Sequence, residues 1–319
     1  MKFIPPISFL SLVLTLITSC QNLNRVSSHD FDISQVKSWA YQLQDADPNT
    51  IASSGFDLMV MDYSRDGTEA TRYAADEIDE IKKHGIIPIA YISIGEAEDY
   101  RFYWKEEWYI NPPPWLGNEN PEWEGNYAVR YWNNEWKQIV FEYLSKVIEQ
   151  GFLGVYLDRV DAFEYWSDCD NGEDECLSEK EAAKRMIDFV EEIAHYCRVV
   201  KREGDFYIIP QNGEKLLDYE STYLRTISGI AVEDLFYYET EPIPQDETEG
   251  RIKYLDKVAR ANKPVFVVDY VDDGTGYFGS NRVRIDDFRA KAISKGYIPY
   301  VAKSDRELDE LNIISGVQP

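Results

Sequence analysis

Residues 70–96 read ATRYAADEIDEIKKHGIIPIAYISIGE, and this stretch decides the fold. Its first part, 70–84, places apolar residues at helical spacing with charged residues on the other face, which is typical of an amphipathic helix. Gly85 is a helix stop, and the apolar run 87–94 that follows indicates a buried strand. A helix followed directly by such a strand indicates repeated βα units and a parallel sheet.

The same alternation extends outward from this stretch in both directions. Helical patterns recur at 134–150, 178–202 and 281–295, with Gly151 and Gly296 as further stops. Eight strands alternating with helices predict a single α/β domain, a (β/α)8 TIM barrel, over residues 36–319. The expected strands are 36–43, 57–63, 87–94, 154–160, 206–212, 229–237, 264–270 and 297–302.

One long segment, 95–133, interrupts this rhythm after the third strand and is crowded with Trp, Tyr and Pro. An insertion of this length is usually functional in a barrel, so we expect it to cover the mouth at the carboxyl ends of the strands. Its aromatic residues, including Trp115, could stack on sugar rings. They could equally pack a small core of their own.

The amino terminus has the pattern of an export signal. Lys2, the apolar run 3–17 and two small residues precede Cys20, which resembles a bacterial lipobox. We therefore expect residues 1–19 to be a signal peptide, Cys20 to be lipidated and 20–35 to be a tether. The protein would then be exported and lipid-anchored in the bacterial cell envelope, at the outer membrane or cell surface. An ordinary signal peptide that happens to contain a Cys is the alternative.

Composition narrows the classes of function. Lys and Arg total 33 against 58 Asp and Glu, a net charge of −25. Such a surface repels nucleic acid and would attract a cationic polymer, although acidity can also serve solubility alone. The chain has three His, which argues against a Ser-His-Asp triad or a His-rich metal site, and we expect no metal and no cofactor. In an oxidising compartment Cys169 and Cys176 could form a loop disulfide, leaving Cys197 as a buried thiol.

Polar residues close several of the expected strands, where a TIM barrel builds its active site. A single acid at such a point is often a helix cap, but carboxylates on five strands are expected to converge on one functional site. The strand-end residues are Asp62, Ser93, Glu96, Asp158, Asp161, Gln211, Asn212, Glu233, Asp234 and Asp269.

Asp158 and Glu233 are the expected catalytic pair, because glycoside cleavage needs two carboxyl groups flanking one bond. If Arg159 turns toward Asp158, its charge would keep the pKa of that carboxyl low, as a nucleophile requires. An apolar setting would raise the pKa of Glu233, as a general acid requires. Asp161 is the rival for the nucleophile, and retention of configuration is the expected outcome.

At these residues the sequence resembles the endo-α-1,4-polygalactosaminidase family, glycoside hydrolase family 114, over roughly residues 36–303. The resemblance implies a (β/α)8 barrel, hydrolysis of α-1,4-linked galactosamine polymers, and catalytic acids at Asp158 and Glu233. Where the family pattern has Pro-Asp-Asn and Glu-Glu, this chain has Leu157-Asp158-Arg159 and Glu233-Asp234. The motifs are WAYQL (39–43), DY (62–63), YISIGEAEDYR (91–101), WLG (115–117), YLDRVD (156–161) and VED (232–234).

The expected partner is an amino-sugar polysaccharide, bound by a monomer that contacts membrane through its lipid alone and binds no nucleic acid. Two other classes remain open: a non-catalytic glycan-binding lipoprotein and a metal-dependent hydrolase using the Asp cluster. The expected substrate contacts are Asp62, Tyr91, Ser93, Glu98, Arg101, Trp115, Asp161, Asn212, Asp234 and Asp269.

Overall fold

The computed structural model describes residues 31–319, so the expected signal peptide and Cys20 lie outside the described residues. Each of the eight expected strand ranges overlaps a parallel strand. These barrel strands are β1 (Trp39–Tyr41), β2 (Leu58–Met61), β3 (Ile87–Ser93), β7 (Gly154–Asp158), β8 (Tyr207–Pro210), β9 (Ile230–Glu233), β12 (Val265–Asp272) and β13 (Ile298–Lys303).

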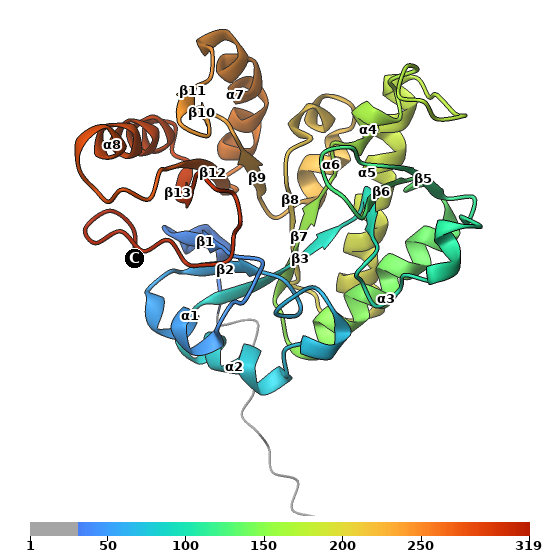
Figure 1. Cartoon of the computed structure of the whole chain (residues 1–319), viewed down its shortest axis with the longest axis horizontal. Helices are drawn as coiled ribbons and strands as arrows, with labels where there is room; N and C mark the ends of the chain where they lie inside the picture. The colour runs from blue at the N-terminus through green and yellow to red at the C-terminus, as the bar shows by residue number, and fades with distance from the viewer. Residues whose placement is uncertain (1–30) are drawn as a thin grey trace, which may run out of the picture.

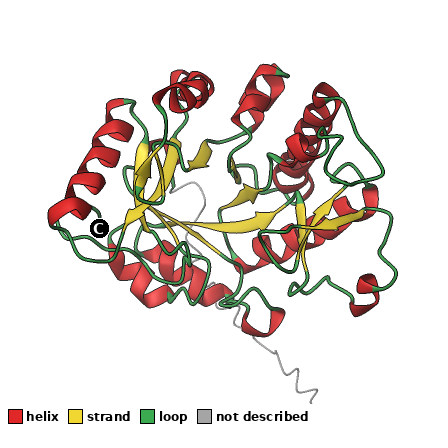
Figure 2. Ribbon diagram, turned by 45° about the horizontal axis from the view of Figure 1, so that its top comes forward, coloured by secondary structure: helices red, strands yellow, loops and turns green. Residues whose placement is uncertain are grey.

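The strands form two parallel sheets, ordered β1-β2-β3-β7-β8 and β9-β12-β13, that complete one ring. A parallel bridge between Gln211 and Ala231 connects β8 to β9. At the other junction β1 lies beside β13, where the Trp39 indole donates a hydrogen bond to the Ile298 carbonyl at 2.9 Å. Helices surround the strands (Figures 1 and 2), so the expected (β/α)8 barrel is confirmed.

Local capping chemistry sets the helix boundaries. The Asn133 side chain accepts a hydrogen bond from the Glu135 amide at the start of α3 (Asn134–Gln150), and Gly151 ends that helix at φ 93°. The Ser178 side chain caps the start of α5 (Glu179–His195) by accepting from the Glu181 amide. The helices are α1 (Pro48–Ser54), α2 (Ala75–Lys83), α3 (Asn134–Gln150), α4 (Ala162–Tyr165), α5 (Glu179–His195), α6 (Ser221–Thr226), α7 (Gln245–Arg260) and α8 (Gly279–Ser294).

Aromatic side chains fill the barrel interior. Trp39 is fully buried, and its ring centroid lies 5.3 Å from that of Phe266, 5.8 Å from that of Tyr300 and 6.3 Å from that of Tyr156. The interior is therefore a packed core and not a pore, which leaves the carboxyl ends of the strands as the place for a site.

The insertion after β3 folds into a small antiparallel sheet ordered β4-β6-β5, in the green segments of Figure 1. Its strands are β4 (Glu96–Glu98), β5 (Leu116–Glu119) and β6 (Asn126–Val129). Trp115 is only 1% exposed, with its ring 5.0 Å from that of Trp108 and 5.1 Å from that of Trp136. The expectation that Trp115 contacts substrate is therefore wrong, because these rings enclose it in a core of the insertion.

A disulfide joins Cys169 to Cys176 in the loop that follows α4. The thiol of Cys197 is buried in the π-helical turn Tyr196–Val200 that follows α5, and burial raises its pKa to about 12, which keeps it protonated. Within residues 31–319, none of the helices has the length and apolar character needed to cross a membrane.

Candidate active site

A pocket of about 490 Å³ lies at the carboxyl ends of the barrel strands. Asp158 at the end of β7 and Glu233 at the end of β9 both line it. Trp123 and Asn126 of the insertion also line the pocket, so the expectation that 95–133 covers the mouth is confirmed. Two strands that are far apart in sequence thus bring their terminal carboxyl groups to one cavity.

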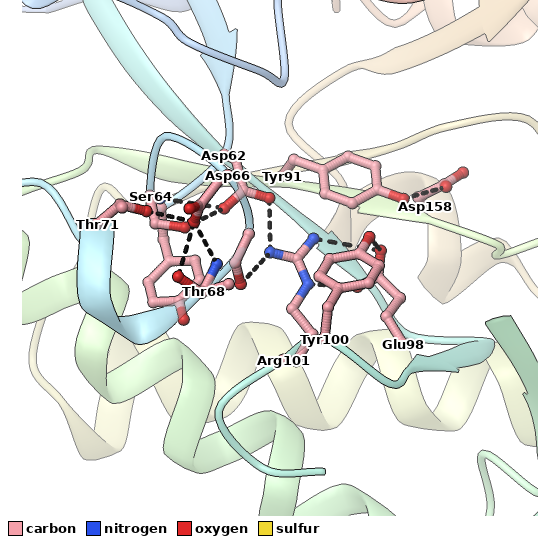
Figure 3. A network of polar contacts seen from close by, with 12 residues as sticks. Asp62, Ser64, Asp66, Thr68, Thr71, Tyr91, Glu98, Tyr100, Arg101 and Asp158 are labelled. Carbon is pink, nitrogen blue, oxygen red and sulfur yellow. Dashed lines mark hydrogen bonds and ion pairs between the residues drawn. The ribbon is translucent and has the colours of Figure 1, made fainter. Parts of the chain in front are cut away.

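Asp158 is held by a tyrosine from the neighbouring strand. The Tyr91 hydroxyl donates to Asp158 Oδ2 at 2.6 Å (Figure 3). Burial raises the pKa of Asp158 above its usual value, although Tyr91 and Arg159 both oppose the rise. The expectation of a lowered pKa is therefore wrong. Arg159 has a left-handed backbone, φ 58°, and its guanidinium pairs with Glu96 at 2.8 Å.

Glu233 has the environment of a general acid. Burial raises its pKa to about 7, and the negative charge of nearby Asp158 adds to the rise. The Tyr270 hydroxyl donates to Glu233 Oε2 at 3.1 Å. A carboxyl with this pKa carries a proton at mildly acidic pH and can deliver it to a leaving oxygen.

Arg101 lies at the centre of a buried polar network on the β2 and β3 side of the pocket (Figure 3). Its guanidinium donates to Asp62 Oδ2 at 2.6 Å and to Glu98 Oε2 at 2.7 Å. The Tyr100 hydroxyl also donates to Glu98, at 2.5 Å. The structure therefore brings three expected substrate contacts, Asp62, Glu98 and Arg101, to the pocket wall.

Asp161 and Asn212 also line the pocket. Burial raises the pKa of Asp161 to about 6. Asn212 adopts a left-handed backbone, φ 57°, and its Oδ1 accepts the Glu233 backbone N–H at 3.3 Å. Asn212 thus fixes the main chain that carries Glu233, while Asp161 presents a carboxyl to the cavity.

Three other expected substrate contacts have structural partners and do not line this pocket. The buried Ser93 hydroxyl accepts the Glu96 backbone N–H at 3.3 Å. Asp234 forms two hydrogen bonds with Arg306. Asp269 is fully buried and accepts backbone N–H groups from the loop after β9, each at 2.9 Å. The expectations for Ser93 and Asp269 are wrong, because both side chains are buried and support the backbone. The Asp234 side chain is 18% exposed, so its contact with substrate stays a prediction.

Sequence reasoning missed several residues that line the pocket, among them Tyr41, Tyr100, Tyr270 and Arg306. Tyr41 lies in the expected strand 36–43, and Tyr270 ends the expected strand 264–270. Their position near strand ends was therefore the signal that could have identified them. Arg306 follows the last strand in a charged loop, where nothing in the local sequence distinguishes it from a surface arginine.

The described part of the chain, residues 31–319, contains no group of three His, Cys, Asp or Glu side chains arranged to hold a metal ion. The pocket is lined by carboxyl groups, tyrosine hydroxyls and three arginines.

Comparison with known proteins gives a consistent result. The model of glycoside-hydrolase family GH114 matches residues 21–317. An uncharacterized protein of Methanocaldococcus jannaschii is 57% identical over 298 residues, which cover 93% of this chain and 83% of the relative.

Two solved structures share the fold at low identity. The glycoside hydrolase domain of PelA from Pseudomonas aeruginosa has a TM-score of 0.64 at 18% identity, covering 87% of this chain and 98% of that one. Aspergillus fumigatus Ega3 in complex with galactosamine has a TM-score of 0.62, also at 18% identity, covering 86% of this chain and 94% of that one. At this identity the similarity demonstrates the fold alone.

Proposed function

Because this chain belongs to glycoside hydrolase family GH114 and is a glycosidase, we propose that it cleaves α-1,4-linked galactosamine-containing polysaccharide with Asp158 and Glu233 as catalytic carboxyl groups. The observation that carries the assignment is the shared pocket, in which Glu233 has a pKa of about 7 raised by burial and by Asp158. A protonated acid and an ionised partner are what glycoside cleavage requires.

In the proposed mechanism Glu233 protonates the glycosidic oxygen while an Asp158 oxygen attacks the anomeric carbon, so the bond to the leaving sugar breaks. Glu233 then removes a proton from water, which attacks the same carbon and releases Asp158. The hydrogen bond from Tyr91 to Asp158 favours the ionised carboxylate. Two inversions at the anomeric carbon give net retention of configuration.

The charges of the pocket favour a cationic substrate. Its three arginines already pair with carboxylates: Arg101 with Asp62 and Glu98, Arg159 with Glu96, and Arg306 with Asp234. Further acids remain to face a ligand, and an amino sugar carries a positive charge that they can compensate. These are Asp66, Asp158, Asp161, Glu124 and Glu307.

The test is turnover on a panel of polymers. Purified protein is incubated with deacetylated and fully acetylated α-1,4-linked galactosamine polymers and with a neutral polysaccharide, and new reducing ends are measured. We expect release from the deacetylated polymer, and loss of nearly all turnover in Asp158→Asn and Glu233→Gln. Asp188→Asn on the exposed face of α5 is the matched control. Binding of the polymer without new reducing ends, or full activity in either pocket variant, would contradict the proposal.

A further inference from the structure

The chain after the last barrel strand returns across the pocket and brings Arg306 into it. The Leu308 carbonyl accepts the backbone N–H groups of Leu43 and Gln44, at 2.8 and 3.1 Å, which fastens this segment to the loop after β1. Arg306 itself has a left-handed backbone, φ 63°, an uncommon conformation for a residue with a Cβ. The segment is therefore held in a defined place above the strand ends.

The Arg306 guanidinium contacts three residues at the Glu233 end of the pocket: Asp234, Tyr270 and Glu233 itself. It donates to both oxygens of Asp234, at 3.0 and 2.8 Å. Its central carbon lies 3.9 Å from the centroid of the Tyr270 ring. One of its nitrogens lies 3.9 Å from Glu233 Oε2, the same oxygen that accepts the Tyr270 hydroxyl.

We propose that Arg306 is a positioning residue for the Glu233 carboxyl: it clamps Asp234, stacks on Tyr270 and so fixes the hydroxyl that orients the acid. The inference rests on the proposed role of Glu233 and deepens it. A bidentate arginine–carboxylate pair resists rotation about both side chains, and stacking of the guanidinium on Tyr270 restricts that ring. Orientation of this kind matters because small misplacement of a catalytic group costs turnover.

A second arginine acts on the same strand end in a different way. Arg251 of α7 donates to the main-chain carbonyls of Glu233 and Asp234, both at 2.9 Å. Arg251 therefore holds the backbone, whereas Arg306 contacts the side chains. The charged and titratable groups that face Glu233 are Tyr41 on β1, Tyr156 and Asp158 on β7, its neighbour Asp234, Arg251 on α7, Tyr270 on β12 and Arg306.

The first test needs no substrate. The protonation of Glu233 is followed by carbon NMR of labelled Glu carboxyls, with the resonance assigned by its loss in Glu233→Gln. Arg306→Gln removes a cation and leaves Asp234 uncompensated, so the Glu233 midpoint should move up by about 0.5 to 1 pH unit. Arg306→Lys keeps the charge and should move it much less.

Arg282→Gln is the matched control, because Arg282 also pairs with an aspartate, Asp286, and lies over a tyrosine ring, that of Tyr277, but outside the pocket. We expect this variant to leave the Glu233 midpoint unchanged. An equal midpoint in wild type and Arg306→Gln would overturn the proposal whether or not the polymer is the substrate.

The second test separates positioning from general damage to the fold. Both Arg306→Lys and Arg306→Gln should reduce kcat on the polymer about 10- to 100-fold, because neither restores the bidentate clamp. On a dinitrophenyl α-galactosaminide, whose leaving group needs no proton, the loss should largely disappear. An equal loss on both substrates would show that Arg306 does not act through Glu233. If the wild type turned over neither substrate, the proposed function would be contradicted. The NMR result would still decide the inference about Arg306.

Discussion

The charge of the Glu233 carboxylate is unfavourable in the native protein, since burial and the nearby Asp158 raise its pKa to about 7. Its side chain is 25% exposed, so water relieves part of this penalty. Between its ordinary pKa and pH 7 the unfolded chain releases a proton that the native protein keeps. The free energy of unfolding therefore falls as pH rises through this window.

Glu233→Gln should remove this pH-dependent fall in the free energy of unfolding. At pH 8 the variant should unfold with a free energy on the order of 1 to 3 kcal/mol higher than the wild type, while at pH 4 the difference should be small. Urea unfolding at the two pH values measures it. A stability difference that is the same at both would contradict the raised pKa of the Glu233 carboxyl.

The pH dependence of kcat/KM should be bell-shaped. Activity should fall above pH 7 as Glu233 loses its proton, and it should also fall at low pH as Asp158 gains one. Because burial raises the pKa of Asp158 as well, the acidic limb should lie above the usual range for an aspartate. The two carboxyl groups interact, so both limbs belong to the pair. A flat profile between pH 5 and 9 would argue against this pair.

Asp158 at the end of β7 and Asp161 in the loop after it should differ in importance. Asp158→Asn should abolish nearly all turnover, because an amide cannot attack the anomeric carbon. Asp161→Asn should reduce activity less if Asp161 only contacts substrate. Comparison of kcat and KM for both variants decides this, and a larger loss of kcat in Asp161→Asn would move the nucleophile to Asp161.

At the scale of elements, the insertion after β3 has two kinds of aromatic residue. Trp115 lies inside its core, whereas Trp123 is 55% exposed and lines the pocket. Trp115→Ala should therefore cost about 3 to 5 kcal/mol of stability and leave the KM of the folded enzyme unchanged.

Trp123→Ala should behave in the opposite way, with unchanged thermal unfolding and a KM raised several-fold through loss of stacking on a sugar ring. Thermal melts and polymer kinetics on the pair measure both effects. If Trp115→Ala raised KM without destabilising the protein, the insertion would be organised differently from the structure.

At the same scale, the segment after β13, which contains Arg306 and Leu308, completes the barrel mouth. It spans the junction between the last and the first strand, and hydrogen bonds from Gln42, Leu43 and Gln44 hold it there. The contacts of Glu233, the proposed acid at the end of β9, thus include a segment that follows all eight strands. This arrangement explains why Asp234, expected to bind substrate, is paired with Arg306.

At the scale of the whole molecule, the net charge of −25 adds a long-range attraction for a cationic polymer. Salt screens this attraction over about 10 Å at 0.1 M. The KM for a deacetylated galactosamine polymer should therefore rise several-fold between low and high salt, while that for a neutral short substrate should change little. An equal change in KM for the two substrates would indicate that the acidic surface serves solubility alone.

The sequence by itself determined the alternation of strands and helices and the strand ends that carry Asp158 and Glu233. These features are local: apolar periodicity, glycine stops and capping residues act within one or two turns of chain. The family motifs added the expected chemistry, because they lie at those same strand ends.

Only the tertiary structure decided which side chains meet. Arg306 contacts Asp234, 72 residues earlier, because closure of the ring brings the last loop over the sixth strand. Arg159 turns to Glu96 and not chiefly to Asp158, and burial outweighs both polar neighbours in raising the pKa of Asp158. Trp115 is buried for the same reason that Asp269 is: long-range packing encloses both residues. Desolvation and contact between distant segments depend on the closed barrel, and no local pattern in the chain encodes them.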